Sequence, residues 1–183
     1  MPDPDPIAEI FELFDRFGSS PYDEAVSMTE HCLQTAVGAI DDGAEDILVA
    51  AALLHDIGHL LLARERESED FLAADWDHET VGADWVRPVF GNAVAGPVAL
   101  HVDAKRFLCG TESSYGELLS PASVASLAVQ GGPFDWEQAA RFEASAYSTD
   151  AVALRWWDDA GKVAGRVVPT LASFEELLRS LRS

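Results

Sequence analysis

The sequence predicts an all-α fold, a bundle of helices packed around one core. Apolar residues recur mostly at helical spacing, whereas alternating strand-like runs are scarce. The chain has 183 residues, 48% of them hydrophobic, which is enough for one compact domain with a sizeable core. Since no repeat, low-complexity tract or long linker divides it, we expect a single domain over residues 1–183.

Three helices are expected in the first third of the chain. Ile7, Ile10 and Phe14 mark one face of the first, which ends at Gly18 and the turn 19–21. The second helix is predicted over 26–42, and the third from 45 or 46 to about 63. The charged stretch 64–70 that follows indicates a helix end and an exposed loop.

The rest of the chain continues the helical pattern. Pro97 is expected to shorten or kink the helix that contains it, because proline lacks the amide donor. Ser120 and Pro121 form an N-cap followed by proline at the first helical position. The predicted helices cover 78–90, 93–107, 120–130, 135–145, 151–160 and about 173–181.

The charge balance is strongly acidic. The chain has 32 acidic and 12 basic residues, a formal net charge of −20. Duplex nucleic acid is therefore excluded as a partner, because phosphate neutralisation requires many Lys and Arg. The acidic residues are spread over the whole chain, which is typical of a solvated surface. Any anionic substrate must be held by a few local cations against this field.

We expect a cytoplasmic protein with no membrane partner, a monomer or weak homo-oligomer. The N-terminus lacks the basic and apolar segments of a signal peptide, and no uninterrupted apolar run approaches the roughly 20 residues of a membrane span. Cys32 and Cys109 form no CxxC motif, and one pair makes no disulfide framework.

The most informative motif is His55-Asp56, inside the apolar run 49–61. An imidazole beside an ionised carboxylate is costly in such surroundings unless a cation binds both, as a metal ion does. For an isolated pair, the alternative is a hydrogen-bonded core histidine followed by a helix-terminal aspartate.

The other histidines favour the metal. Each of the five falls within or at the start of a predicted helix, and Asp158 lies on a late helix. Helical bundles commonly build metal sites at their centre from facing helices, and His with carboxylate suits iron, manganese or zinc. The candidate ligands are His31, His55, Asp56, His78, His101 and Asp158.

Two basic residues share helix faces with candidate ligands. Lys105 follows His101 by four residues, and Arg155 precedes Asp158 by three, so both could hold an anion at the metal. The alternative is a surface lysine and a salt-bridged arginine. A polar stripe near a helix N-terminus that favours anions is formed by Ser123, Ser126 and Gln130.

The order of these residues resembles the binuclear branch of the HD-domain superfamily. Its simplest members retain only the first His, the His-Asp pair and the last Asp. The resemblance implies a single HD-domain helical bundle with a central binuclear metal site, with its metal-binding core at about 22–162. Asp56 would bridge two ions, one completed by His31, His55 and Asp158 and the other by His78 and His101.

A closer resemblance is to the mixed-valent di-iron oxygenases of organophosphonate catabolism (the PhnZ type). It rests on the segments 31–36, 55–59, 101–109, 119–123 and 130–133. It implies two Fe ions, Fe(II)/Fe(III), with O2 as co-substrate and a small organophosphonate as substrate. The expected reaction cleaves the carbon-phosphorus bond of 2-amino-1-hydroxyethylphosphonate, giving glycine and phosphate, or of its N-trimethyl analogue.

The resemblance also gives roles to three further residues. His59 would contact the substrate, although support of a metal-bound carboxylate is an alternative. Glu24 would recognise the substrate's amino group. Tyr22 would occupy the open iron position until substrate displaces it, and the alternative is a loop tyrosine packed on the bundle.

Two other functions remain open at the level of sequence. A metal-dependent phosphohydrolase, the commonest activity of the HD superfamily, would use a bridging hydroxide against a phosphate ester and need no oxygen. A metal-stabilised signalling or binding domain would need no catalysis at all.

Overall fold

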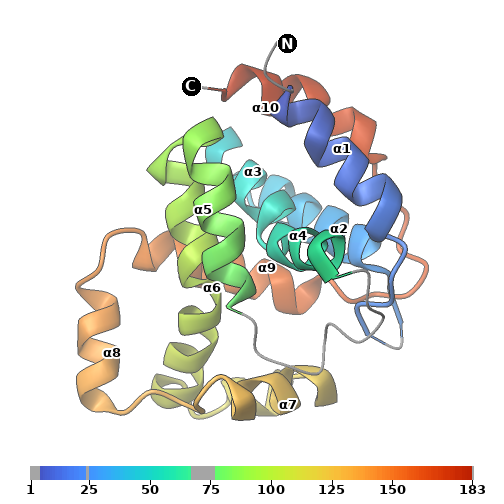
Figure 1. The fold of residues 1–183 in the computed structure, drawn as a ribbon. Coiled ribbons are helices and arrows are strands. Elements are labelled where there is room, and N and C mark those ends of the chain that lie inside the picture. Colours follow the sequence, from blue (N-terminus) through green and yellow to red (C-terminus); the bar gives the residue numbers. More distant parts are fainter. Residues whose placement is uncertain (1–4, 24, 67–76, 183) are drawn as a thin grey trace.

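The computed structural model describes residues 5–23, 25–66 and 77–182 (Figure 1). Within these ranges all regular structure is helical apart from one isolated bridge between Pro21 and Ser27, so the predicted all-α bundle is confirmed. The α-helices are α1 (Pro6–Phe17), α2 (Met28–Asp41), α3 (Asp46–Leu54), α4 (Ile57–Arg66), α5 (His78–Phe90), α6 (Asn92–Thr111), α7 (Pro121–Val129), α8 (Trp136–Glu143), α9 (Ser148–Ala160) and α10 (Glu175–Ser180); the short 3₁₀ helices are η1 (Tyr115–Leu118) and η2 (Leu171–Phe174).

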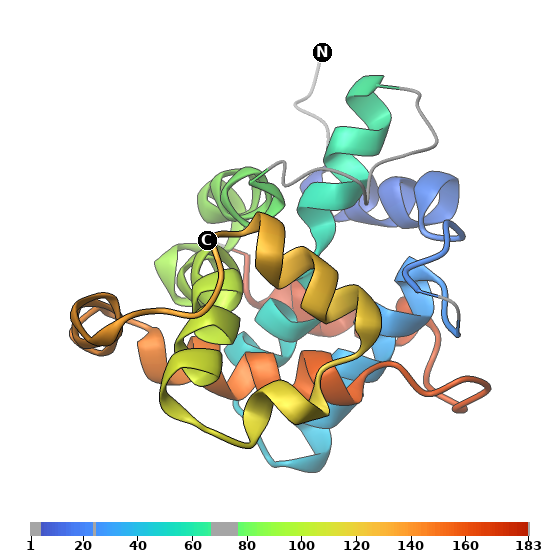
Figure 2. The same cartoon turned by 90° about the horizontal axis from the view of Figure 1, so that it is seen from below.

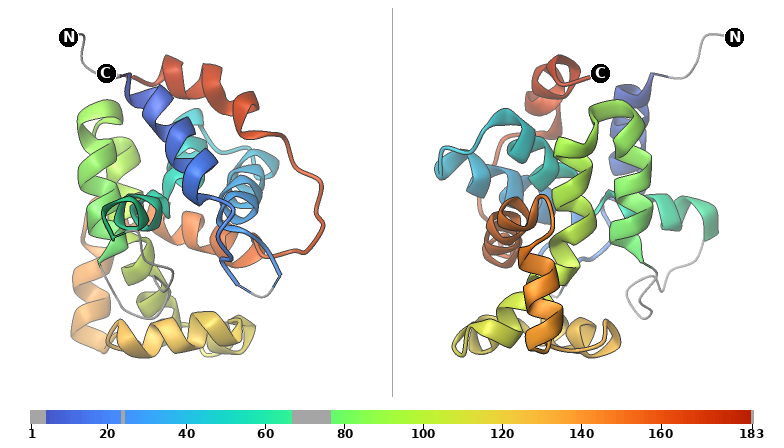
Figure 3. Two further views of the ribbon diagram at one scale, coloured as in Figure 1. Left: turned by 45° about the vertical axis from the view of Figure 1, so that its right-hand side comes forward. Right: turned by 90° about the vertical axis from the view of Figure 1, so that its left-hand side faces the viewer.

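The long helix α6 organises the bundle. It packs against α5, α9 and α3, while α2 packs against α3 and α9. The first and last α-helices, α1 and α10, lie together at one end of the molecule (Figure 1), and Arg179 Nη1 lies 3.0 Å from Oδ2 of Asp5, which precedes α1. At the opposite end, α7 and α8 lie below the bundle in both views of Figure 3. The centre of the bundle is thus enclosed by α2, α3, α5, α6 and α9.

The structure corrects the prediction of one helix from 45 or 46 to 63. That segment is two helices, α3 and α4, separated by a turn at His55 and Asp56. The carbonyl of Ala52, the helical acceptor for the amide of Asp56, accepts a hydrogen bond from Nδ1 of His55 at 2.8 Å. A side chain that competes for a backbone acceptor weakens the helix at that point. The break directs both His55 and Asp56 toward the bundle centre.

Asp46–Glu65, which spans this break, has the length and apolar composition of a membrane-crossing helix. Yet 83% of its most apolar window is buried inside the protein. Such burial is typical of the core segment of a compact helical domain.

The expectation that Pro97 shortens its helix is wrong. Helix α6 continues through Pro97 as far as Thr111. Because α6 is packed against helices on several sides, tertiary packing outweighs the backbone hydrogen bond lost at a proline.

Other helix ends follow the expected local signals. Ser27 and Glu30 form a capping box at the start of α2, and Ser120 caps α7 as predicted. Helix α9 begins at Ser148, three residues before its predicted start, and η1 was not predicted. Short 3₁₀ turns give only a weak periodic signal in the sequence.

Candidate metal centre and adjoining cavity

The structure brings the six candidate ligands together at the centre of the bundle. They come from α2, the turn between α3 and α4, α5, α6 and α9, and each is at most 6% exposed. They are His31, His55, Asp56, His78, His101 and Asp158.

One group of donor atoms surrounds the Nε2 atom of His31. It lies 3.1 Å from Nε2 of His55, 3.5 Å from Oδ2 of Asp56 and 3.4 Å from Oδ1 of Asp158. Nε2 of His55 lies 3.1 Å from Oδ2 of Asp56. These atoms could hold one metal ion.

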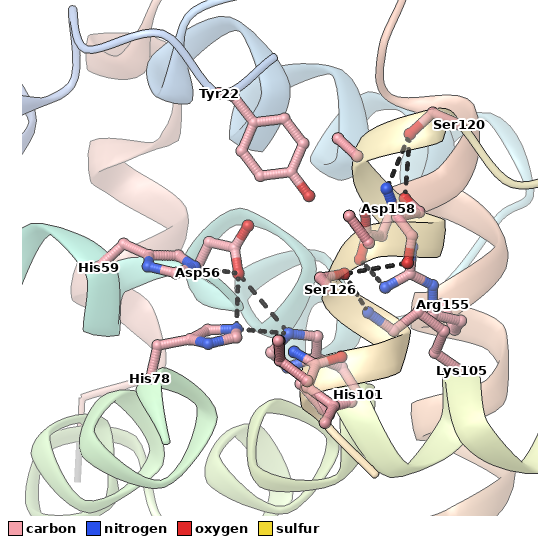
Figure 4. Close-up of a pocket in the computed structure, with 16 residues that line it drawn as sticks. Tyr22, Asp56, His59, His78, His101, Lys105, Ser120, Ser126, Arg155 and Asp158 are labelled. Atoms are coloured by element: carbon pink, nitrogen blue, oxygen red, sulfur yellow. Dashed lines mark hydrogen bonds and ion pairs between the residues drawn. The ribbon is translucent and has the colours of Figure 1, made fainter. Parts of the chain in front are cut away.

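A second group lies on the other side of Asp56. Its Oδ1 atom is 3.3 Å from Nε2 of His78 and 3.6 Å from Nε2 of His101, and these two nitrogens are 3.2 Å apart (Figure 4). Each oxygen of Asp56 therefore faces a different pair of imidazoles. This is the geometry of a carboxylate that bridges two ions.

Backbone hydrogen bonds orient three of the imidazoles. Nδ1 of His31, His55 and His101 donates to a carbonyl, which leaves the lone pair of each Nε2 directed at the centre. The acceptors are the carbonyls of Gly161, Ala52 and Val98, at 2.9, 2.8 and 2.7 Å. Nε2 of His31 and Nε2 of His55 are 3.1 Å apart, and because two lone pairs at that distance repel one another, a cation between them would stabilise the arrangement.

The electrostatics fit metal binding as well. Burial lowers the pKa of His31 to about 4 and the pKa of His101 well below its usual value, so both are neutral near pH 7. Burial would raise the pKa of Asp158, but Arg155 holds it below the usual range. Oδ1 of Asp158 is buried and receives no hydrogen bond from the described residues. A cation would satisfy this oxygen.

A cavity of about 400 Å³ opens beside this centre (Figure 4). Asp56, His78, His101 and Asp158 form part of its wall. Glu24, one of the predicted substrate contacts, lies outside the described residues. The predicted contacts within the described residues all line the cavity: Tyr22, His59, Lys105, Ser123, Ser126, Gln130 and Arg155.

Two buried cations lie on one side of the cavity. Lys105 donates from Nζ to Ser126 Oγ at 2.7 Å, and burial lowers its pKa to about 8. Arg155 lies with Nη1 2.6 Å from Oδ2 of Asp158, and its Nε donates to Asp159. Both are 3% exposed, so the alternative of a surface lysine does not hold. Arg155 does form the salt bridge that was the alternative to anion binding, but it also lines the cavity.

The remaining wall contains aromatic and amide groups. His59 stacks on His78 with ring centroids 4.0 Å apart, and its Nε2 lies 3.9 Å from Oδ1 of Asp56. Tyr22 stacks on His31 at 3.7 Å with its hydroxyl directed into the cavity (Figure 4). Oε1 of Gln130 is buried without a hydrogen-bond partner among the described residues. All three are placed to contact a bound molecule.

Sequence reasoning missed a set of charges next to this wall. Asp159 accepts hydrogen bonds from Arg155, from Lys162 at 3.3 Å and from the hydroxyl of Tyr115. Lys162 also donates to Ser123 Oγ at 3.1 Å. Lys162 follows Asp158 by four residues, the spacing that singled out Lys105, and this signal could have identified it.

Comparisons with known proteins identify the family of the chain. The HD domain family matches residues 28–125. A hydroxymethylphosphonate dioxygenase of Gimesia maris is 45% identical over 174 residues, covering 95% of this chain and 87% of that protein. A 1-hydroxy-2-(trimethylamino)ethylphosphonate dioxygenase of Leisingera caerulea, which forms glycine betaine, is 38% identical and covers 92% and 86%.

These matches extend past the HD domain itself. The relatives cover nearly the whole chain, including the segment beyond residue 125 that contains Arg155 and Asp158. The names of these relatives support an oxygenase that uses a metal, and the His and Asp cluster is a candidate site for that metal. The chain belongs to the HD-domain family and, within it, to the phosphonate dioxygenases.

Proposed function

We propose that this protein is a mixed-valent Fe(II)/Fe(III) oxygenase that uses O2 to cleave the carbon-phosphorus bond of a small 1-hydroxyphosphonate. The observation that carries the proposal is the cavity in which two donor groups joined by Asp56 adjoin Lys105 and Arg155. The whole chain, 1–183, would form one such domain and act in the cytoplasm as a monomer or weak homo-oligomer.

The iron pair would supply the redox chemistry that activates O2 and would polarise the substrate's oxygens. His31, His55 and Asp158 would hold one ion, His78 and His101 the other, and Asp56 both. Lys105 and Arg155 bind and orient the phosphonate dianion by charge-assisted hydrogen bonds. Tyr22 covers the open side of the first donor group until substrate enters.

Hydroxymethylphosphonate is the first substrate to test. The 45% identical relative is named for that compound. The described part of the cavity wall contains no carboxylate other than Asp56 and Asp158, so within it no free acid is available for an amine. The reaction balances as hydroxymethylphosphonate plus O2 giving formate plus phosphate.

The second candidate substrate is an aminated 1-hydroxyphosphonate, because Glu24 could recognise its amino group. The 38% identical relative is named for a trimethylamino compound, and the resemblance of the sequence gave Glu24 the role of recognising an amine. 2-Amino-1-hydroxyethylphosphonate would then give glycine and phosphate. Glu24→Gln should lower kcat/KM for the aminated compounds only, with the rate on hydroxymethylphosphonate as the internal control.

The decisive experiment measures oxygen uptake and phosphate release together. Anaerobically reduced, partly reoxidised iron protein is mixed with hydroxymethylphosphonate, 2-amino-1-hydroxyethylphosphonate or its N-trimethyl analogue. We expect one phosphate per O2 consumed, and an EPR signal of a coupled mixed-valent pair that changes when substrate binds. Absence of phosphate from all three compounds would contradict the proposal.

A parallel assay tests the phosphohydrolase alternative. Manganese-loaded protein is incubated with nucleotides and simple phosphate esters under nitrogen. We expect no turnover, because the two relatives are named as dioxygenases and not as hydrolases. Fast phosphate release without oxygen would favour the hydrolase.

A further inference from the structure

Helix α7 forms one wall of the cavity but is not held there by hydrophobic packing. It lies outside the bundle in Figure 1 and crosses its lower end in Figure 2. Of its nine residues, mostly Ala and Val, Ser123 alone is buried, while Val124 and Val129 are 49% and 61% exposed. A short helix gains its stability in a protein mainly by burying an apolar face, and α7 buries none. Polar contacts must therefore hold it over the cavity.

The chain has two lysines, and both donate to α7. Lys105 on α6 donates to Ser126 Oγ at 2.7 Å, and Lys162, just after α9, donates to Ser123 Oγ at 3.1 Å. Ser123 and Ser126 are three residues apart and lie on one face of the helix. In a chain with a net charge of −20, its two lysines thus link α6 and the end of α9 to α7.

Lys162 is fixed in place by the acidic side of α9. Its Nζ lies 3.3 Å from Oδ1 of Asp159 and 3.5 Å from Oδ1 of Asp158, and 5.6 Å from the ring centroid of Tyr22. Asp159 in turn accepts hydrogen bonds from Arg155 and from the hydroxyl of Tyr115. One carboxylate therefore holds two cations, Arg155 and Lys162, at fixed positions beside the cavity.

We propose that Lys162 is a positioning residue for the oxyanion: held by Asp159, it fixes Ser123 and with it α7 over the cavity. The Ser123 hydroxyl, which accepts from Lys162, then lies where it can donate to an anion that Lys105 and Arg155 attract, whereas Ser126 donates its own proton to the carbonyl of Ser123. Nζ of Lys162 donates to Ser123 and to Asp159 and lies 3.5 Å from Oδ1 of Asp158, and Lys162 is not among the residues that line the cavity, so it acts through Ser123 and not by direct contact with the anion. The inference rests on the proposed function only for the identity of that anion.

Kinetics of the iron-loaded protein provide the first test. Lys162→Met should raise KM for hydroxymethylphosphonate about tenfold, with kcat changed less than about threefold and iron content unchanged, because α7 loses one of two anchors. Lys162→Arg should recover most of the loss, since guanidinium keeps the donors. The matched control is Arg166→Met, which removes a cation four residues further on whose partner is the exposed Asp41, at 3.2 Å.

Hydrogen exchange of the amides of α7 provides a test that does not need turnover. In the unaltered protein, inorganic phosphate should slow exchange over 121–129. In Lys162→Met these amides should exchange faster without phosphate and be slowed less by it, whereas Arg166→Met should behave like the unaltered protein.

Two outcomes would overturn the inference. One is a Lys162→Met protein whose α7 exchange and KM are unchanged. The other is loss of iron with a matching fall in kcat, which would make Lys162 a support of Asp158 and not of α7. If no 1-hydroxyphosphonate is turned over by the unaltered protein, the proposed function fails, and the exchange measurement still decides the role of Lys162.

Discussion

Asp56 is the residue on which both donor groups depend. Oδ2 faces His31 and His55, and Oδ1 faces His78 and His101, all within 3.6 Å. Without Asp56, the second donor group would contain only imidazoles, and the first would contain imidazoles and Asp158. Neutral imidazoles alone leave the charge of two metal ions largely uncompensated in a buried site.

Asp56→Ala should therefore lose both metals together. We expect fewer than half the metal ions per chain and a fall in activity of more than about 100-fold, because even changing a residue that only orients a ligand typically costs 10–100-fold. Metal analysis and EPR measure this directly. His59→Ala is the control, since His59 lies 3.9 Å from Asp56 but outside both donor groups, and it should keep its metal. Two bound metals in Asp56→Ala would rule out bridging.

Lys105 should give the reaction an upper pH limit. Burial lowers its pKa to about 8, and the ammonium is the form that attracts an anion. Above that pH the positive charge is lost, so phosphonate binding weakens as pH rises, while below it the charge is fully present. We expect kcat/KM to fall about 20-fold between pH 7.5 and 9.5, because kcat/KM reports ionisations of the free enzyme.

Lys105→Arg separates this ionisation from others in the site. Guanidinium stays charged throughout the range, so the fall above pH 8 should disappear even if the absolute rate drops. Identical pH profiles for both proteins would assign the limit to another group.

Among the helices, α4 makes a close contact with α5 just after the break between α3 and α4. A Cβ added to Gly58 would lie 1.9 Å from the backbone oxygen of His78 and 3.0 Å from the amide of Gly82. Two glycines therefore let α4 and α5 approach, and this contact places His78 beside Asp56. The His-Asp-x-Gly-His motif thus contains two candidate ligands and the contact that positions a third.

Gly58→Ala should destabilise the fold and loosen the second donor group. The added methyl meets backbone, which cannot move aside cheaply, so we expect a loss of about 1–3 kcal/mol or more in the free energy of unfolding. Urea denaturation and metal analysis would measure both effects. Gly116→Ala, where no atom lies within 4 Å of the added Cβ, should change stability by less than about 0.5 kcal/mol. Equal stability of the two variants would show that the contact is not limiting.

Local signals predicted most helices and the members of the central cluster. Helical periodicity and the caps at Ser27 and Ser120 are signals that act over a few residues. The candidate ligands could be chosen because the chain has only five histidines. The break at His55 was not predictable, because it depends on a hydrogen bond from the His55 side chain to the carbonyl of Ala52. The contacts of Tyr115 with Asp159 and of Ser123 with Lys162 span 44 and 39 residues, and no short-range pattern encodes them.

For the molecule as a whole, the proposed anion site lies inside a chain of net charge −20. The cations that attract the anion are buried and act at short range, whereas the acidic surface acts over the Debye length. That length shrinks from about 30 Å at 0.01 M salt to about 8 Å at 0.15 M, so added salt removes mostly the repulsion. The long-range field therefore opposes association until it is screened.

Raising salt should consequently speed the reaction with a phosphonate dianion. We expect kcat/KM for hydroxymethylphosphonate to increase about two- to fivefold between 10 and 150 mM potassium acetate, since like charges slow diffusional encounter. The KM for O2 is the internal control, because a neutral molecule does not sense the field. Repeating the series with potassium chloride separates screening from competition by a particular anion at Lys105 and Arg155. A fall in kcat/KM in both salts would mean that the local cations, and not the acidic surface, govern encounter.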